Sequence, residues 1–269
     1  MPIIDITDPD DPRLDPYRVL SRSCVQSSPS GFVAQGVNVV NRLLTSTLAI
    51  HSMMVVTNKI DQLTPQPAES VTLYRITKAI LKSVAGTGYK SGVYAHAEQP
   101  KLLEIGTFLS SLASDEPITV LILSNSNNPR NIGAMIRSAA GLGAHGVILG
   151  DHSADPFHNQ SVRASMGAVF GMPLIQCDDL KQGLIQLHQE GGFQLAATVL
   201  DAEATPLMQT KREQKRIGIV MGNEYNGLSQ DCITQCQQKI TLPMANETDS
   251  LNVTMAATLF LYHYRYLAT

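Results

Sequence analysis

The chain has 269 residues, 43% of them hydrophobic, and a formal net charge of −3. This length is enough for one large domain or two modest ones, each with its own hydrophobic core. No apolar run reaches the roughly 18 residues that a membrane-spanning helix needs, and the acidic start argues against a signal peptide. Four scattered cysteines show no disulfide framework, so a reducing, cytoplasmic setting is expected. Cys232 and Cys236 lack a second His/Cys pair at zinc spacing, so we expect structural thiols and no metal.

Charge is distributed unevenly along the chain. Residues 1–16 have a net charge of −4, residues 17–97 carry eight basic and two acidic side chains, and residues 98–269 have a net charge of −5. A basic block within an acidic protein is typical of a surface that binds a polyanion, above all a nucleic acid. The alternative is a chance excess of cations on a solvated surface.

In chain order, residues 1–16 contain four prolines and few apolar residues, which predicts an arm or a poorly ordered lead-in. Residues 17–97 predict a small α/β domain with strands at 32–33, 51–57 and 93–97 and helices at 36–48 and 77–84. The glycine-rich loop 86–92 could clamp a phosphate or be only a turn.

Composition and charge both change near residue 100, which predicts a linker over 98–116 that includes a helix at 102–112. From residue 117 to 269, short apolar strands alternate with helices. The strands are expected at 118–123, 146–149, 172–175, 193–199, 217–221 and 240–242, and the helices at 132–142, 160–168, 180–189, 230–235 and 251–266. This alternation predicts a parallel sheet covered by helices on both faces.

In open α/β sheets, ligands bind just past the carboxyl ends of the strands. The segments Gly222-Asn223-Glu224 and 243–252 occupy such positions, and Gly222 would let a ligand approach its backbone closely. The alternative is that both are ordinary loops. The loop after the first strand lacks the glycine pattern of dinucleotide sites and the lysine loop of P-loop proteins. Arg130 and Arg137 share a helix stripe there, which indicates either an anion site or two solvated arginines.

Three blocks read together resemble a known family. They are N-P-R-N-I-G-A-M-I-R-S-A-A-G-L-G-A, I-V-M-G-N-E-Y-N-G-L-S and I-T-L-P-M-A-N-E-T-D-S-L-N-V-T-M-A-A. Each follows a predicted strand, and in order and placement they are similar to the three motifs of the SpoU/TrmH-type RNA 2′-O-ribose methyltransferases of the SPOUT superfamily. Two segments near the front, F-V-A-Q-G-V-N-V-V-N-R-L-L and G-T-G-Y-K-S-G-V-Y-A, more weakly resemble the ribosomal-protein-like RNA-binding domain of many members. Asn223 stands where serine is commoner, and Tyr225-Asn226 is bulkier than usual.

The resemblance implies a parallel sheet with a C-terminal trefoil knot, S-adenosylmethionine as cofactor and a homodimer with the site at the interface. The cofactor would be held by backbone groups of Gly222, Leu242 and Leu251, and the whole cofactor site it implies comprises Thr198, Gly222, Leu242, Pro243 and Leu251. Arg137 would be the key catalytic residue, with Asn131, Glu224, Ser250 and Asn252 fixing the geometry around it. Independently of the resemblance, residues 251–264 carry no charge, which predicts a helix buried in the core or against a partner.

The function expected from these patterns is methyl transfer to a ribose 2′-hydroxyl of ribosomal or transfer RNA, with residues 17–97 binding the substrate. Two alternatives stay open: a non-catalytic RNA-binding or assembly factor on the same fold, and methylation of a base rather than a ribose. His263 is expected to be a packed core or interface residue rather than a catalytic one.

Overall fold

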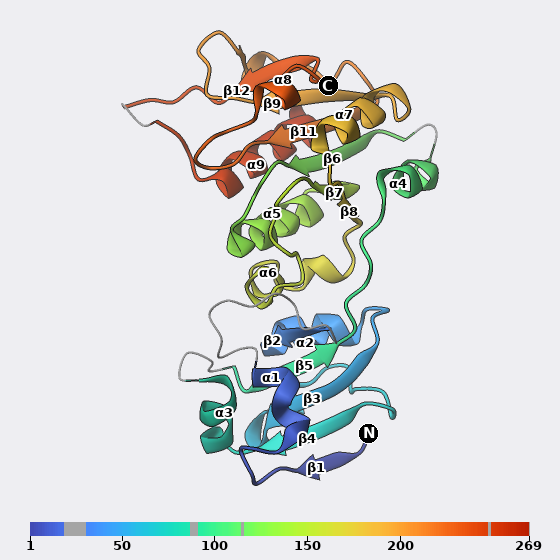
Figure 1. Ribbon diagram of the computed structural model, residues 1–269, viewed down its shortest axis with the longest axis vertical. Helices are drawn as coiled ribbons and strands as arrows, with labels where there is room; N and C mark the ends of the chain where they lie inside the picture. The colour runs from blue at the N-terminus through green and yellow to red at the C-terminus, as the bar shows by residue number, and fades with distance from the viewer. Residues whose placement is uncertain (19–30, 87–90, 114–115, 247–248, 269) are drawn as a thin grey trace. The chain divides into compact units, whose positions relative to one another are not determined.

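Two β-sheets organise the chain, each in its own structural unit (Figure 1). The computed structural model describes residues 1–18, 31–86, 91–113, 116–246 and 249–268. The first unit comprises Met1–Lys101 and Asp155–Gly171, and the second comprises Leu102–Ala154 and Met172–Thr269. Cys24 and part of the glycine-rich loop 86–92 lie outside the described residues.

The first unit is built on a five-stranded sheet of order β1-β4-β3-β5-β2. Its strands are β1 (Ile3–Asp5), β2 (Phe32–Gln35), β3 (Ile50–Val56), β4 (Thr72–Ile76) and β5 (Val93–Ala97). β1, β4 and β3 run parallel, whereas β5 is antiparallel to both β3 and β2. Its helices are α1 (Asp15–Arg18), α2 (Val37–Leu44) and α3 (Lys78–Ala85), with short 3₁₀ turns at Pro12–Leu14 and Thr57–Gln62.

The expectation of a separate or poorly ordered arm at residues 1–16 is wrong. β1 pairs with β4, and Leu14 is fully buried in the core of the first unit with Tyr17. The prolines misled the prediction, because Pro12 opens a 3₁₀ turn that leads directly into α1. The strand β4, which lies between β1 and β3, was not predicted at all.

The first unit also takes in a segment that is remote in sequence. Helix α6 (Asn159–Ala164) packs on β2, and the Phe32 ring lies 5.1 Å from that of Phe157 and 5.7 Å from that of Phe170. Arg42 donates a hydrogen bond to the Met166 carbonyl at 2.9 Å. The helix ends earlier than predicted because Met166 and Gly167 adopt positive φ angles.

The second unit is built on a seven-stranded, wholly parallel sheet of order β10-β12-β9-β11-β6-β7-β8. Its strands are β6 (Ile118–Leu123), β7 (Gly146–Leu149), β8 (Leu174–Gln176), β9 (Phe193–Thr198), β10 (Thr205–Pro206), β11 (Arg216–Met221) and β12 (Gln238–Thr241). Its helices are α4 (Ile105–Ser111), α5 (Pro129–Gly141), α7 (Leu180–Gln189), α8 (Gln230–Ile233) and α9 (Val253–Tyr262).

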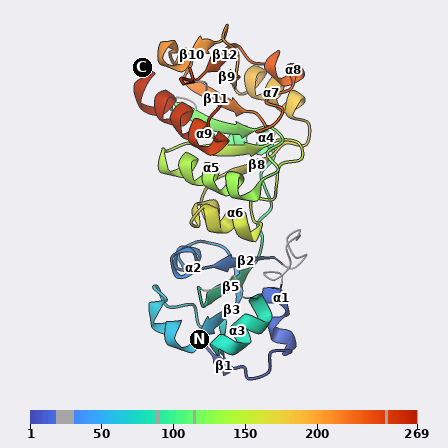
Figure 2. The same cartoon turned by 90° about the vertical axis from the view of Figure 1, so that its left-hand side faces the viewer.

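Helices cover both faces of this sheet, as predicted. Figure 2 shows α5 and α9 together on one face, with α7 and α8 on the other. The predicted linker is largely part of this unit, because Phe108 of α4 is 1% exposed within its core and Leu103 bridges to Ile175. Among the described residues, none of the helices combines the length and apolar character needed to cross a membrane.

Candidate active site

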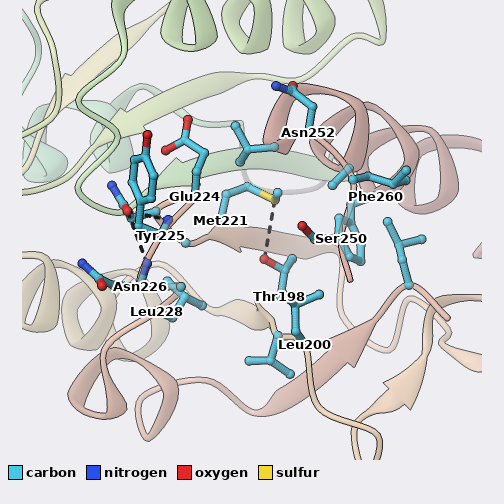
Figure 3. A pocket seen from close by; sticks show the side chains of 18 of the residues that line it. Thr198, Leu200, Met221, Glu224, Tyr225, Asn226, Leu228, Ser250, Asn252 and Phe260 are labelled. Carbon is cyan, nitrogen blue, oxygen red and sulfur yellow. Dashed lines mark hydrogen bonds between the residues drawn. The ribbon is translucent and has the colours of Figure 1, made fainter. Parts of the chain in front are cut away.

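A cavity of about 590 Å³ lies past the carboxyl ends of β9, β11 and β12. Three loops and the start of α9 form it, and Figure 3 shows their side chains around the opening. Its lining residues are Thr198, Val199, Leu200, Met221, Gly222, Asn223, Glu224, Tyr225, Asn226, Gly227, Leu228, Ile233, Leu242, Met244, Ser250, Leu251, Asn252, Val253, Ala256 and Phe260. Most of these side chains are apolar, and the polar ones are concentrated in the two loops predicted as a site.

Gly222 is required by the closure of its own loop. A Cβ at this position would lie 2.5 Å from the Gly227 carbonyl carbon and 2.7 Å from the Leu228 nitrogen. Since both are backbone atoms, no side-chain rotation could relieve the contact. The fold of the loop itself therefore requires glycine here, and the predicted close approach of a ligand to Gly222, which lines the cavity, stays a prediction.

Asn223 organises the same loop. Its Nδ2 donates to the Asn125 carbonyl at 2.7 Å, which ties the loop to the one after β6. Its Oδ1 accepts from the Tyr225 backbone nitrogen at 2.9 Å, and its backbone exchanges two hydrogen bonds with Gly227. The asparagine that departs from the commoner serine therefore holds the turn and the neighbouring loop together.

The first turn of α5 also reaches this loop. Asn128 caps the helix by accepting a hydrogen bond from the Arg130 nitrogen at 3.0 Å, and Pro129 follows at the first helical position. Asn131 then donates from Nδ2 to the Glu224 carboxylate. Two of the predicted catalytic residues, from widely separated parts of the chain, are thus in direct contact.

Arg137 lies two turns further along α5, on the face opposite the buried residues of the helix. It is exposed, and no hydrogen bond or ion pair joins its side chain to another described residue. It does not line the cavity of its own chain. Its side chain is therefore available to a group outside the chain.

A series of hydrogen bonds runs from the cavity along α9 to α5. Asn252 caps α9 by accepting from the Thr254 nitrogen at 2.9 Å. Thr258 donates to the Thr254 carbonyl at 2.7 Å, and its hydroxyl also lies 2.8 Å from that of Ser138. Because Ser138 adjoins Arg137, these contacts fix the helix that carries the arginine relative to the cavity.

The structure gathers most of the predicted site residues in this one place. Those that line the cavity are Thr198, Gly222, Glu224, Leu242, Ser250, Leu251 and Asn252. Asn131 does not line the cavity itself but donates a hydrogen bond to Glu224, which does. Arg137 and Pro243 do not line it. The prediction missed Leu200, Leu228, Ala256 and Phe260, whereas Met244 lies in the predicted segment 243–252. For Ala256 and Phe260, the helical spacing from Asn252 was the available signal.

Two thiols of the second unit, neither of which lines the cavity, are not activated nucleophiles. Burial raises the pKa of the Cys236 thiol to about 12 and that of Cys177 to about 11, so neither thiol ionises near neutral pH. His263 is a packed core residue, 8% exposed, with its Nε2 3.0 Å from the Thr210 hydroxyl. Within the described ranges, no cluster of His, Cys, Asp and Glu side chains is placed to hold a metal ion.

A wholly parallel sheet with a largely apolar cavity past its strand ends is typical of α/β proteins that bind a small ligand at that edge. The model of the SpoU rRNA methylase family matches residues 118–262. The chain belongs to the SpoU rRNA methylase family, which confirms the resemblance found in the three motifs.

Known proteins match almost the full chain in sequence or in structure. An uncharacterised tRNA/rRNA methyltransferase of Mycobacterium bovis is 30% identical, over 96% of this chain and 90% of its own length. An S-adenosylmethionine-bound rRNA methyltransferase of Sinorhizobium meliloti has the same fold, with a TM-score of 0.81, 24% identity and coverage of 97% of this chain and 96% of the other. The structure of an RNA 2′-O ribose methyltransferase is similar with a TM-score of 0.78, 25% identity and coverage of 96% and 97%.

Proposed function

We propose that this protein transfers a methyl group from S-adenosylmethionine to a ribose 2′-hydroxyl of RNA, with ribosomal RNA favoured over transfer RNA. The observation that carries the proposal is the cavity at the strand ends, which brings the second and third motifs together beside the first. Two similar proteins support the 2′-hydroxyl as target. One is the RNA 2′-O ribose methyltransferase described above. The other is a 23S rRNA (uridine-2′-O)-methyltransferase of Streptomyces viridochromogenes, 31% identical over 53% of this chain and 50% of its own length.

The residues present fit the cofactor. The cavity volume lies within the range of about 300–1,000 Å³ usual for small-molecule sites and its walls at Leu228, Leu242 and Phe260 suit an adenine ring. When bound, S-adenosylmethionine supplies a methyl group on a positively charged sulfur. Thr198 is held at the cavity wall by the hydrogen bond from its hydroxyl to the Val220 carbonyl at 2.9 Å. We also propose that this part of the sheet is threaded as a trefoil knot; β11, which follows β6 and β9 in sequence, lies between them.

Arg137 is the residue to which we assign transition-state stabilisation. A 2′-hydroxyl is a poor nucleophile, so negative charge that develops on its oxygen must be stabilised. A guanidinium keeps its proton at all ordinary pH values and can hold the adjacent phosphate with two parallel hydrogen bonds. Asn131 orients the Glu224 carboxylate at the rim of the cavity, and Asn252 fixes the start of α9. These contacts position the groups around the reacting hydroxyl, which is the main contribution that such a transfer needs.

The homodimer is part of the proposal because α9 leaves an apolar stripe uncovered. Met255 is 61% exposed, Leu259 44% and Tyr262 48%, at a spacing that places them on one side of the helix. Tyr266, 52% exposed, lies in the π-helical turn His263–Leu267 that follows, with its ring 5.2 Å from that of Tyr262. An uncovered stripe of this kind is typical of a protein–protein interface. Since Arg137 does not line the cavity of its own chain, we assign it to the cavity of the partner subunit.

The first unit is proposed to bind the RNA outside the active site. Lys78 and Lys82 are exposed on one face of α3, and Thr77 caps that helix beside Lys78. These lysines belong to the stretch of residues 17–97, which carries a net charge of +6. Cations in this arrangement attract phosphates without reading the sequence.

The test is to incubate the protein with S-adenosylmethionine labelled in its methyl group and with ribosomal or transfer RNA, and then to digest the RNA to nucleosides. The proposal expects the label on a ribose 2′-oxygen. Label on a base would make the protein a base methyltransferase. RNA binding without any transfer would support the alternative of a non-catalytic assembly factor.

A further inference from the structure

The loop Gly222–Leu228 presents one large aromatic side chain to solvent. Tyr225 lines the rim of the cavity, yet its residue surface is 88% exposed. Figure 3 shows its ring beside the Glu224 carboxylate, both projecting from the same side of the loop. This ring is the bulky departure from the family pattern that the second motif showed.

The turn that carries Tyr225 is held firmly at its base. Asn223 accepts hydrogen bonds from the backbone nitrogens of Tyr225 at 2.9 Å and Asn226 at 3.4 Å. The Asn223 backbone pairs with Gly227 at 3.1 and 2.9 Å, and Gly227 has a φ of 64°. The position of the Tyr225 backbone is therefore set before any ligand arrives, so that binding orders only the side chain.

The ring makes no evident contribution to the fold. No aromatic contact or side-chain hydrogen bond joins Tyr225 to another residue in the described part of the chain. Exposure alone does not indicate a binding role, because Met208 is 87% exposed and does not line the cavity. Two further features distinguish Tyr225. It is exposed on a fixed turn at the rim of the cavity, and its neighbour Glu224 contacts Asn131.

From this placement we infer that Tyr225 is a stacking platform for a nucleobase of the RNA, at or next to the nucleotide that is methylated; the inference rests on the proposed function. Proteins recognise unpaired bases by stacking them on aromatic rings, and such stacking tolerates any base. A small ligand inside the cavity would have most of its surface covered by the walls. A ring at the rim with 88% exposure faces the larger substrate instead. Tyr225 is thus a positioning residue that raises RNA affinity and not cofactor affinity.

Steady-state kinetics test this assignment. Tyr225→Ala should raise KM for RNA about 5-fold to 150-fold, the range that corresponds to loss of one base–aromatic stack, with cofactor affinity unchanged. Tyr225→Phe should behave like the wild type because the stacking face is kept, and Met208→Ala is the matched control. An unchanged KM in Tyr225→Ala, or an equal loss of cofactor affinity, would overturn the assignment.

Fluorescence gives a readout that does not depend on turnover. The chain contains no tryptophan, so Tyr225→Trp places a single reporter at the rim. A short single-stranded oligoadenylate should quench its emission, whereas S-adenosylhomocysteine alone should not. Emission that is indifferent to RNA contradicts the stacking role even if the wild type transfers methyl groups. Quenching in a protein that transfers no methyl to any RNA would instead refute the proposed function and leave the platform standing.

Discussion

The two sheets of this protein differ in strand direction, and that difference decides what their edges can do. In the second unit all seven strands are parallel, so the loops after β9, β11 and β12 meet at one edge and enclose a cavity. In the first unit β5 runs antiparallel to β3, so its start lies beside the end of β3, where Gly92 accepts a hydrogen bond from Val56 at 2.8 Å. We therefore propose that the parallel edge holds the small cofactor and that the first unit, with its basic surface, binds the large RNA substrate.

The largest expected effect comes from removing the side chain that we assign to the reaction itself. Arg137→Ala should lower kcat by at least about a hundredfold, as for loss of a transition-state donor. The melting temperature should not change, because the side chain is exposed and makes no hydrogen bond or ion pair with the described residues. Arg137→Lys should recover little, since a point charge does not replace a planar donor pair. Methyl-transfer kinetics provide the measurement, with Lys211→Ala as a control for loss of an exposed cation.

Mixing two impaired chains sharpens the same prediction. Ala256→Leu weakens cofactor binding and Arg137→Ala removes the donor, so each homodimer should have little activity at a cofactor concentration well below the weakened Kd. If the site is shared between subunits, mixed dimers regain one intact site and measurable activity. Verified mixed dimers without activity would show that Arg137 does not act across the interface.

The dimer itself should depend on the exposed stripe of α9. Met255→Asp places a charge where we expect an apolar interface, and burying an unpaired charge is costly. The dimer should weaken by about tenfold or more while the monomer stays folded, because Met255 is 61% exposed. Light scattering over a dilution series measures this, with Met208→Asp as the matched control. A Met255→Asp protein that dimerises like the wild type would place the interface elsewhere.

The smallest effect should come from the first unit. Replacing both Lys78 and Lys82 by glutamine should raise KM for RNA a few-fold. The slope of log binding constant against log salt concentration should become less steep by about one for each phosphate contact that is lost. Cofactor affinity should stay unchanged. The matched pair Lys211→Gln with Lys239→Gln removes two exposed charges from the second unit. Equal losses in both pairs would mean that the first unit has no special part in RNA binding.

Deleting the first unit is a poorer test than these point substitutions. Phe157 and Phe170, which come from the middle of the chain, pack on Phe32 within this unit, so a deletion would expose them.

Much of the second unit could be predicted from the sequence because its strands are continuous apolar runs that begin and end at turn residues. The ends of β6 and β7 agree with their predicted limits, since Ser124 and Gly150 follow directly. The first unit was harder to predict. β4, with sequence T-L-Y-R-I, was missed because its composition is mixed; its arginine pairs with Asp5 of the neighbouring strand β1 at 2.5 Å.

In the site, too, some features could be predicted from local sequence and others depend on contacts between distant residues. Motif residues in the loops that follow strands, such as Glu224 and Leu251, could be predicted because a parallel sheet brings these loops together at one edge. The role of Gly222 could not be predicted, because the clash that excludes a Cβ comes from the backbone of its own loop five residues later. The direct contact between Asn131 and Glu224 likewise depends on tertiary packing.

Calorimetric titration of the full-length protein with S-adenosylmethionine tests the central claim most directly, namely that the parallel edge holds the cofactor. The wild type should bind without RNA. Ala256→Leu should weaken binding about 5-fold to 100-fold by overfilling the cavity wall, while Ala202→Leu, at an exposed turn, should bind normally. Unchanged affinity in Ala256→Leu would contradict the placement of the cofactor in this cavity.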